Sequence, residues 1–190
     1  RQNLLQTMKP VIESLRSMKE GFSEELSKLK RLEKQILVER HLISRELASK
    51  SQGSAIVLSM DETFCVMINE EDHLRIQVLQ PGLEFEKVWK RADELDSGIE
   101  SQVNYAYDCE LGFLTACPTN LGTGLRASAM MHLPGLVMSK NMDKVINAVN
   151  QLGIAVRGLF GEGSDASGSI FQISNQQTLG ESEGAIIDRL

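Results

Sequence analysis

The sequence predicts an α+β fold in which an antiparallel β-sheet is flanked by helices. Short runs rich in β-branched and aromatic residues begin at residue 54, and most connections between them are short enough for hairpins. Segments with apolar residues at helical spacing precede the first run and separate later ones. Strands joined largely by hairpins, with helices set to one side, are typical of this fold class.

The beginning of the chain is expected to be helical. Apolar residues recur there at helical spacing, and Pro10 is expected in the first turn of a helix. A second helical pattern follows Gly21 and is heavily charged on its other side. The small polar run SKSQGS, at residues 49–54, predicts a linker. We therefore expect a partial helical section over residues 1–50 and a second domain over residues 51–190.

The second domain is expected to contain both strands and helices. Its strands are predicted at residues 54–60, 63–68, 73–80, 112–118, 125–134, 154–160 and 169–174. Its helices are predicted at residues 83–103 and 139–152. Ser139 is the expected N-cap of the second helix, and Gly153 is expected to end it.

The composition is that of an ordinary globular protein and argues against several classes. The 190 residues are 42% hydrophobic and 24% charged, and no apolar run approaches the roughly 20 residues that span a bilayer. The first residues lack the pattern of a secretory signal, and three cysteines do not make a disulfide framework. The formal charge of −6 argues against a general nucleic-acid binder. We expect a cytoplasmic protein with no membrane partner and no direct nucleic-acid partner.

Three consecutive acids occupy a strand-to-strand connection in the segment NEEDHLR, residues 69–75. Adjacent carboxylates repel one another unless a cation binds or solvent screens them. One interpretation is a solvated turn, because charged residues favour exposed turns. In the other interpretation, a carboxylate faces a cleft and binds a cationic substrate, and Arg75 points to the rim of the same cleft.

The segment CPTNLGTGLRAS, residues 117–128, combines a thiol with a loop suited to anions. Such a loop can offer backbone N–H groups to an anion, and Arg126 is suited to bidentate phosphate contact. Cys117 has two other interpretations: a small buried hydrophobe, or a nucleophile served by His73 or His132. No local signature of a cysteine hydrolase surrounds it.

The segment VRGLFGEGSDASG, residues 156–168, places Arg157 in a strand and Glu162 in a loop rich in glycine and serine. Such a loop can close over a ligand, although a plain surface hairpin loop has the same composition. It is neither a Walker A motif nor a dinucleotide fingerprint, because no Lys-Ser/Thr pair follows and no helix opens there.

These three segments, in this order, resemble the phosphagen (guanidino) kinase family, which includes creatine and arginine kinases. CPTNLGTGLRAS is highly specific, and the resemblance covers nearly everything from Ser54 to the C-terminus. VERHLIS, MMHLP, NQLG and the run from GEGS to TLG are similar to the bacterial protein-arginine kinase branch. The resemblance implies that residues 51–190 form a C-terminally truncated ATP:guanido phosphotransferase catalytic domain with a glutamine-synthetase-like fold.

The resemblance implies transfer of the ATP γ-phosphate to arginine guanidino groups of proteins. Arg75, Arg126 and Arg157 would clamp the ATP phosphates, with Mg²⁺ held mainly by phosphate oxygens and water. Glu71 would hold the substrate guanidinium and remove its proton. Glu162 would hold the guanidinium from the other side.

The resemblance also assigns the three cysteines. Cys117 would lie beside the substrate guanidinium as a thiolate, without a covalent intermediate, and neighbouring cations would lower its pKa. Cys65 and Cys109 fall outside the motif and are expected to be structural. Glu70 and Asp72 are expected to be secondary.

The expected partners follow from the same branch. They are proteins with exposed arginine, among them a stress-response repressor and proteins marked for Clp degradation, together with an activator protein and a Clp-type chaperone. A homodimer is also expected.

The sequence departs from the family pattern at one place. The family's Ser-Arg-Ile-Arg-type segment has no counterpart here, so the phosphate clamp is incomplete without further chain. Because the chain opens at Arg1 without Met and closes at Leu190 in an apolar-periodic segment, we expect a fragment.

Two other functions stay open. One is a kinase for a free guanidino compound such as arginine, and the other is a regulatory module that binds nucleotide or partner proteins without turnover. The presence of Glu71, Cys117 and Glu162 argues against a degenerate active site.

Overall fold

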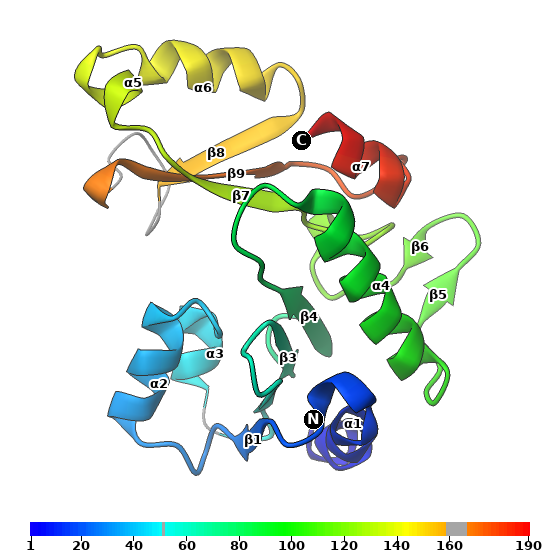
Figure 1. The fold of residues 1–190 in the computed structure, drawn as a ribbon. Helices are drawn as coiled ribbons and strands as arrows, with labels where there is room; N and C mark the ends of the chain where they lie inside the picture. The colour runs from blue at the N-terminus through cyan, green and yellow to red at the C-terminus, as the bar shows by residue number, and fades with distance from the viewer. Residues whose placement is uncertain (51, 159–166) are drawn as a thin grey trace. The chain divides into compact units, whose positions relative to one another are not determined.

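The structure is a computed structural model that describes residues 1–50, 52–158 and 167–190. The chain forms two compact units, Arg1–Tyr105 and Ala106–Leu190, and each has its own sheet. Figure 1 shows the helices and strands of each unit.

The first unit is built on a four-stranded antiparallel sheet. The strands are β1 (Phe22–Glu25), β2 (Ala55–Leu58), β3 (Phe64–Ile68) and β4 (Leu74–Val78), and they lie in this order across the sheet. The central strands β2 and β3 are buried along their whole length, which is why both read as continuous apolar runs.

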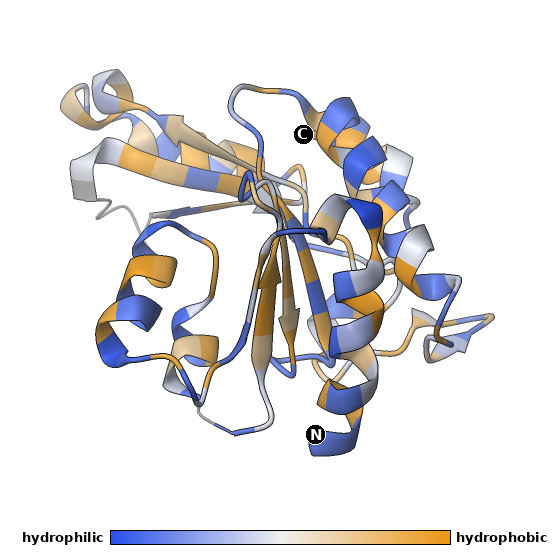
Figure 2. Cartoon of the chain, turned by 60° about the horizontal axis from the view of Figure 1, so that its bottom comes forward, coloured by the Kyte–Doolittle hydropathy of each residue, from blue (hydrophilic) through white to orange (hydrophobic). Residues whose placement is uncertain are grey.

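Helices cover both faces of this sheet. Helices α1 (Gln2–Ser14) and α4 (Phe85–Glu100) pack on one face, and α2 (Arg31–Glu39) and α3 (Arg45–Ser49) on the other. Successive strand residues point to opposite faces. Val57 therefore belongs to the first apolar cluster and the adjacent Ile56 to the second. Figure 2 shows hydrophobic and hydrophilic residues alternating around the helices, as this packing requires.

The second unit contains a three-stranded antiparallel sheet in the order β7-β9-β8. These strands are β7 (Ser128–His132), β8 (Ile154–Gly158) and β9 (Ile170–Asn175), and β9 pairs with both of the others. The remaining elements are the short hairpin β5 (Tyr107–Asp108) and β6 (Gly112–Phe113), and the helices α5 (Pro134–Met138), α6 (Met142–Asn150) and α7 (Glu183–Arg189). Buried apolar side chains come from β8, β9, α6 and α7.

The predicted α+β class is confirmed, and several element predictions are wrong. Pro10 lies inside α1 and not in its first turn, because the buried residues Leu5, Met8 and Ile12 hold both halves of the helix on the sheet. The predicted strand at residues 112–118 shrinks to two residues, since a 3₁₀ turn (Pro118–Asn120) follows it closely. Asn141, and not Ser139, is the N-cap position of α6.

The expected division at residue 50 also differs from the structure. Strand β1 pairs with β2, and Gly53 O accepts a hydrogen bond from the buried side chain of Asn69, at 2.5 Å from its Nδ2. The structure divides the chain at Tyr105 instead. Among the described residues, no helix is long and apolar enough to cross a bilayer.

Candidate active site

The acidic segment begins at a tightly fixed turn between β3 and β4. Asn69 is buried and adopts the left-handed conformation with φ 60°. Its N–H donates to His73 O at 2.9 Å, and its Nδ2 donates to Arg1 O at 3.1 Å and to Gly53 O. Asparagine tolerates this conformation better than most residues, so the turn can present the acids that follow in one orientation.

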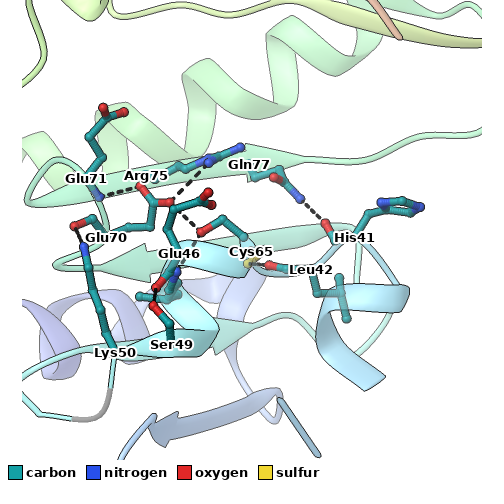
Figure 3. A network of polar contacts seen from close by, with 12 residues as sticks. His41, Leu42, Glu46, Ser49, Lys50, Cys65, Glu70, Glu71, Arg75 and Gln77 are labelled. Atoms are coloured by element: carbon teal, nitrogen blue, oxygen red, sulfur yellow. Dashed lines mark hydrogen bonds and ion pairs between the residues drawn. The ribbon is translucent and has the colours of Figure 1, made fainter. Parts of the chain in front are cut away.

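Glu70 is the buried centre of a polar network at this turn (Figure 3). Its Oε1 accepts a hydrogen bond from Ser44 Oγ at 2.5 Å and lies 3.6 Å from Arg75 Nη1. Its Oε2 accepts a hydrogen bond from the Glu71 N–H, and its backbone carbonyl accepts one from Lys50 Nζ. The interpretation of the whole segment as a solvated turn is therefore wrong for Glu70, whose side chain is only 5% exposed.

Glu71 and Arg75 are exposed beside this buried carboxylate. Arg75 lies on β4 opposite Met67, and its side chain is 47% exposed. Its ion pair with Glu70 brings the guanidinium to the acidic turn. The first unit thus brings together Glu71 and Arg75, and Glu70 contacts both.

Two residues of this network were not identified from the sequence. Ser44 and Lys50 lie just before and just after the short helix α3, far from the acidic segment along the chain. Ser44 is followed by a helical stretch, so its role as an N-cap could have been predicted. Nothing in the sequence connects either residue to Glu70, because that contact depends on how α3 packs on the sheet.

In the second unit, Cys117 lies at the start of the 3₁₀ turn formed by Pro118–Asn120. Its side chain is partly exposed, and its Sγ lies 3.0 Å from Thr119 Oγ1. Thr115 Oγ1 donates to the Cys117 carbonyl at 2.7 Å, which fixes the backbone on the other side. The thiol is thus oriented by its neighbours and is not fully buried.

The loop after Cys117 is anchored to the segment that follows β9. Thr178 Oγ1 lies 3.0 Å from Thr119 O and 2.7 Å from Leu121 O, and Thr178 O accepts from the Thr123 N–H at 2.9 Å. Gly122 has φ +102°, and a Cβ there would lie 2.4 Å from Thr178 O. Only glycine therefore fits this close approach of two backbone segments.

Asn175 holds the end of the same loop. Its side chain accepts from the Ala127 N–H at 2.9 Å and donates to Leu125 O at 2.9 Å and to Gln177 O at 2.8 Å. Asn175 is buried, so these contacts satisfy polar groups that water does not reach. Arg126, an exposed residue, lies between the two positions that Asn175 fixes.

Arg157 lies on β8 opposite Gln172 of β9, and Gln172 pairs in turn with Met130 on β7. Gln172 Nε2 also donates to Ser128 Oγ at 2.9 Å, on the same face of the sheet. Glu162, the remaining predicted site residue, lies outside the described residues.

The two cysteines outside the motif differ from each other. Cys65 is fully buried, donates to Leu42 O at 2.8 Å, and has its thiol pKa raised to about 12 by burial. It is the structural residue that the sequence predicted. Cys109 is exposed at the turn of the β5–β6 hairpin, so that prediction is not met there. No group of three or more His, Cys, Asp or Glu suited to a metal occurs in the described part of the chain.

Comparison with known proteins decides the family. A family model described as ATP:guanido phosphotransferase, C-terminal catalytic domain, matches residues 3–190. The chain belongs to this family. The protein-arginine kinase of Geobacillus thermodenitrificans is 58% identical over 162 residues, which are 85% of this chain and 45% of that protein. The protein-arginine kinase of Pelotomaculum thermopropionicum is 53% identical over 165 residues, 87% of this chain and 46% of that protein.

Solved structures agree on the fold. The duplicated taurocyamine kinase from Schistosoma mansoni, with bound transition state analogue components, is 27% identical and has a TM-score of 0.86 over 99% of this chain and 27% of its own. Lombricine kinase is also 27% identical, with a TM-score of 0.84 over 100% of this chain and 56% of its own. The chain spans about half the length of the curated relatives it matches.

Proposed function

We propose that the full-length protein is a protein-arginine kinase, which transfers the γ-phosphoryl group of ATP to arginine side chains of other proteins. The observation that carries this proposal is the identity of 52–58% to relatives named protein-arginine kinase. Kinases named for taurocyamine and lombricine are only 27–28% identical. Family membership supports the enzyme class and ATP as the phosphoryl donor.

Glu71 is proposed to hold the acceptor guanidinium and to take up its proton. A guanidinium is protonated at neutral pH and has no lone pair for attack on phosphorus. A carboxylate beside it orients one nitrogen and accepts the proton released as the N–P bond forms and ADP leaves. The exposure of Glu71, next to a buried and fixed Glu70, supports this role because an acceptor can reach it. Glu162 is proposed to hold the guanidinium from its other side.

Arg75, Arg126 and Arg157 are proposed to bind the ATP phosphates. Fixed guanidinium groups offset the negative charge that spreads over the phosphate oxygens during transfer. The half-exposed side chain of Arg75 and the partly exposed Arg157 support the proposal, since both are accessible to an anion. Mg²⁺ bound to ATP would neutralise further phosphate charge. This ion would be held mainly by phosphate oxygens and water.

Cys117 is proposed to lie beside the acceptor guanidinium as a thiolate, without forming a covalent bond. Its partial exposure and its fixed backbone support a role in contact with substrate. By the resemblance of its motifs, the protein is further proposed to act as a homodimer in the cytoplasm. Its proposed partners are an activator protein, a stress-response repressor and a Clp-type chaperone.

The test is phosphoryl transfer from radiolabelled ATP by the full-length protein to casein and, separately, to free L-arginine. We expect acid-labile, alkali-stable label on the protein substrate, and its loss in Glu71→Ala and Cys117→Ala. Label on free arginine alone would assign the protein to the kinases of small guanidino compounds. Binding of ATP without transfer to either acceptor would favour a regulatory module.

A further inference from the structure

Helix α3 contacts Glu70 from both of its ends. Ser44 precedes the helix and donates to the Glu70 carboxylate, while Lys50 follows the helix and donates to the Glu70 backbone carbonyl. Figure 3 shows Lys50 reaching up to the turn that carries Glu70 and Glu71. One short helix therefore fixes both the side chain and the backbone of the same residue.

The Ser44 hydroxyl serves two partners at once. It accepts a hydrogen bond from the Leu47 N–H at 3.0 Å, which caps α3, and it donates its proton to Glu70 Oε1. A hydroxyl has one proton and two lone pairs, so both bonds can form together. The position of the carboxylate is thereby tied to the first turn of the helix.

Glu70 in turn contacts two exposed residues, Glu71 and Arg75. Oε2 accepts from the backbone N–H of Glu71, and Oε1 forms the ion pair with Arg75. A carboxylate that is almost fully buried depends on such partners, because water does not replace a donor that is lost. Displacing Glu70 would therefore move both Glu71 and Arg75.

We propose that Ser44 and Lys50 are positioning residues that clamp Glu70 and so orient Glu71 and Arg75 for phosphoryl transfer. This rests on the proposed function of Glu71 and Arg75. Neither Ser44 nor Lys50 touches substrate in this proposal, and both act through Glu70.

Substitutions at Ser44 can separate the clamp from helix capping. Threonine keeps the hydroxyl and should retain activity. Glycine caps a helix nearly as well as serine but has no group to offer Glu70. Aspartate also caps well, yet it would place a second carboxylate against Glu70. Ser49→Ala, at an exposed hydroxyl on the same helix that bonds only to Glu46 O in the described structure, is the matched control.

In the full-length kinase, with ATP and casein, we expect Ser44→Gly to lower kcat about 10-fold and to raise KM for ATP about fivefold. Ser44→Asp should lower kcat about 100-fold, while Ser44→Thr and Ser49→Ala stay near the wild type. Lys50→Met should resemble Ser44→Gly, with Lys87→Met, an exposed lysine on α4, as its control. A merely structural role would lower kcat through loss of folded enzyme and leave KM for ATP unchanged.

ADP binding, measured by calorimetry, gives a second readout that needs no turnover. Ser44→Gly should weaken ADP binding about fivefold, because Arg75 loses its fixed partner. Wild-type kinetics and ADP affinity in Ser44→Gly and Ser44→Asp would overturn the proposal. A defect in Ser44→Ala alone would not support it, because alanine is a weaker helix cap. An inactive wild type would refute the proposed function instead, and the ADP measurement would still decide whether the clamp orients Arg75.

Discussion

Glu70 and Glu71 are the same residue type at adjacent positions, yet the fold gives them opposite surroundings. The Glu70 carboxylate contacts three donors and its backbone carbonyl accepts from a fourth, whereas Glu71 is exposed. Removing a partner from a buried carboxylate is costly, and changing an exposed one affects stability little. Stability should therefore respond mainly to Glu70, whereas a change at Glu71 should affect activity with little effect on stability.

The first prediction compares Glu70→Gln with Glu71→Gln. Glu70→Gln should lower the free energy of unfolding by about 2 kcal/mol, because the buried carboxylate that bonds to Ser44 and the Glu71 N–H and pairs with Arg75 is lost. Glu71→Gln should change it by less than about 0.5 kcal/mol, yet lower kcat of the full-length kinase at least about 100-fold. Urea unfolding and phosphoryl transfer to casein measure the two effects. Equal stability losses in the two variants would contradict the assigned burial.

The second prediction concerns the buried thiol of Cys65. Burial raises its pKa from 9.0 to about 12. Above pH 9 the unfolded chain releases this proton while the folded chain keeps it, so the free energy of unfolding falls as pH rises. Between pH 9 and 10.5 the wild type should lose about 1.5 kcal/mol more than Cys65→Ala, as urea unfolding at each pH would measure. Cys109→Ala should follow the wild type, because Cys109 is exposed. Parallel pH profiles for wild type and Cys65→Ala would show that the thiol is not buried.

At this scale the sequence identified residues but not their surroundings. The resemblance to the guanidino kinase family singled out Glu71, Arg75 and Cys117 within these motifs. The residue pattern itself did not show which of the adjacent acids is buried, because burial at the turn depends on contacts with Ser44 and Lys50 that no local pattern encodes.

The secondary-structure elements that were predicted well are those in which the pattern of apolar residues shows which side chains are buried. Strands β2 and β3 are apolar on both faces and were found within a few residues. Strand β1 has the sequence FSEE and was missed, because it joins the sheet edge through backbone pairing with β2 and is half exposed. Likewise, the strand expected at residues 112–118 gives way to a loop whose anchors come from distant residues.

The third prediction concerns the anchoring of that loop after Cys117. Asn175→Ala should lower the free energy of unfolding by about 2 kcal/mol, since it removes the partner of the partly buried Ala127 N–H and Leu125 O. Thr178→Val keeps the shape and should cost about 1 to 2 kcal/mol. Gln176→Ala, at an exposed neighbour, is the control. Urea unfolding checks all three, and a cost for Asn175→Ala no larger than that of the control would refute the anchor.

At the scale of the whole molecule, composition suggested a division that the fold does not follow. A small polar run at residues 49–54 is typical of linkers, but here Gly53 and Ser54 bond to Asn69, and Ser54 O also accepts from the N–H of Leu26, directly after β1. The second apolar cluster, which lies on the side of the sheet covered by α2 and α3, likewise includes residues from both sides of residue 50. Leu26, Leu42 and Leu47 precede it, and Ile56 and Met67 follow it. The polar segment itself does not show that apolar residues before and after it pack in one cluster.

The last prediction is that Arg1–Tyr105 folds without the rest of the chain. Both apolar clusters of this unit and all four strands of its sheet lie within these residues. A chain of this size with its own core unfolds cooperatively, so we expect one urea transition with an m value of about 1 to 2 kcal/mol/M. Residues 1–82 are the matched control, because they lack α4 and with it the buried Leu95 and Ile99. That shorter chain, and residues 51–105, which lack β1 and half of the second apolar cluster, should show no cooperative transition. Cooperative folding of residues 51–105 would restore the division expected from composition, and a non-cooperative 1–105 would show that the first sheet depends on the residues that follow it.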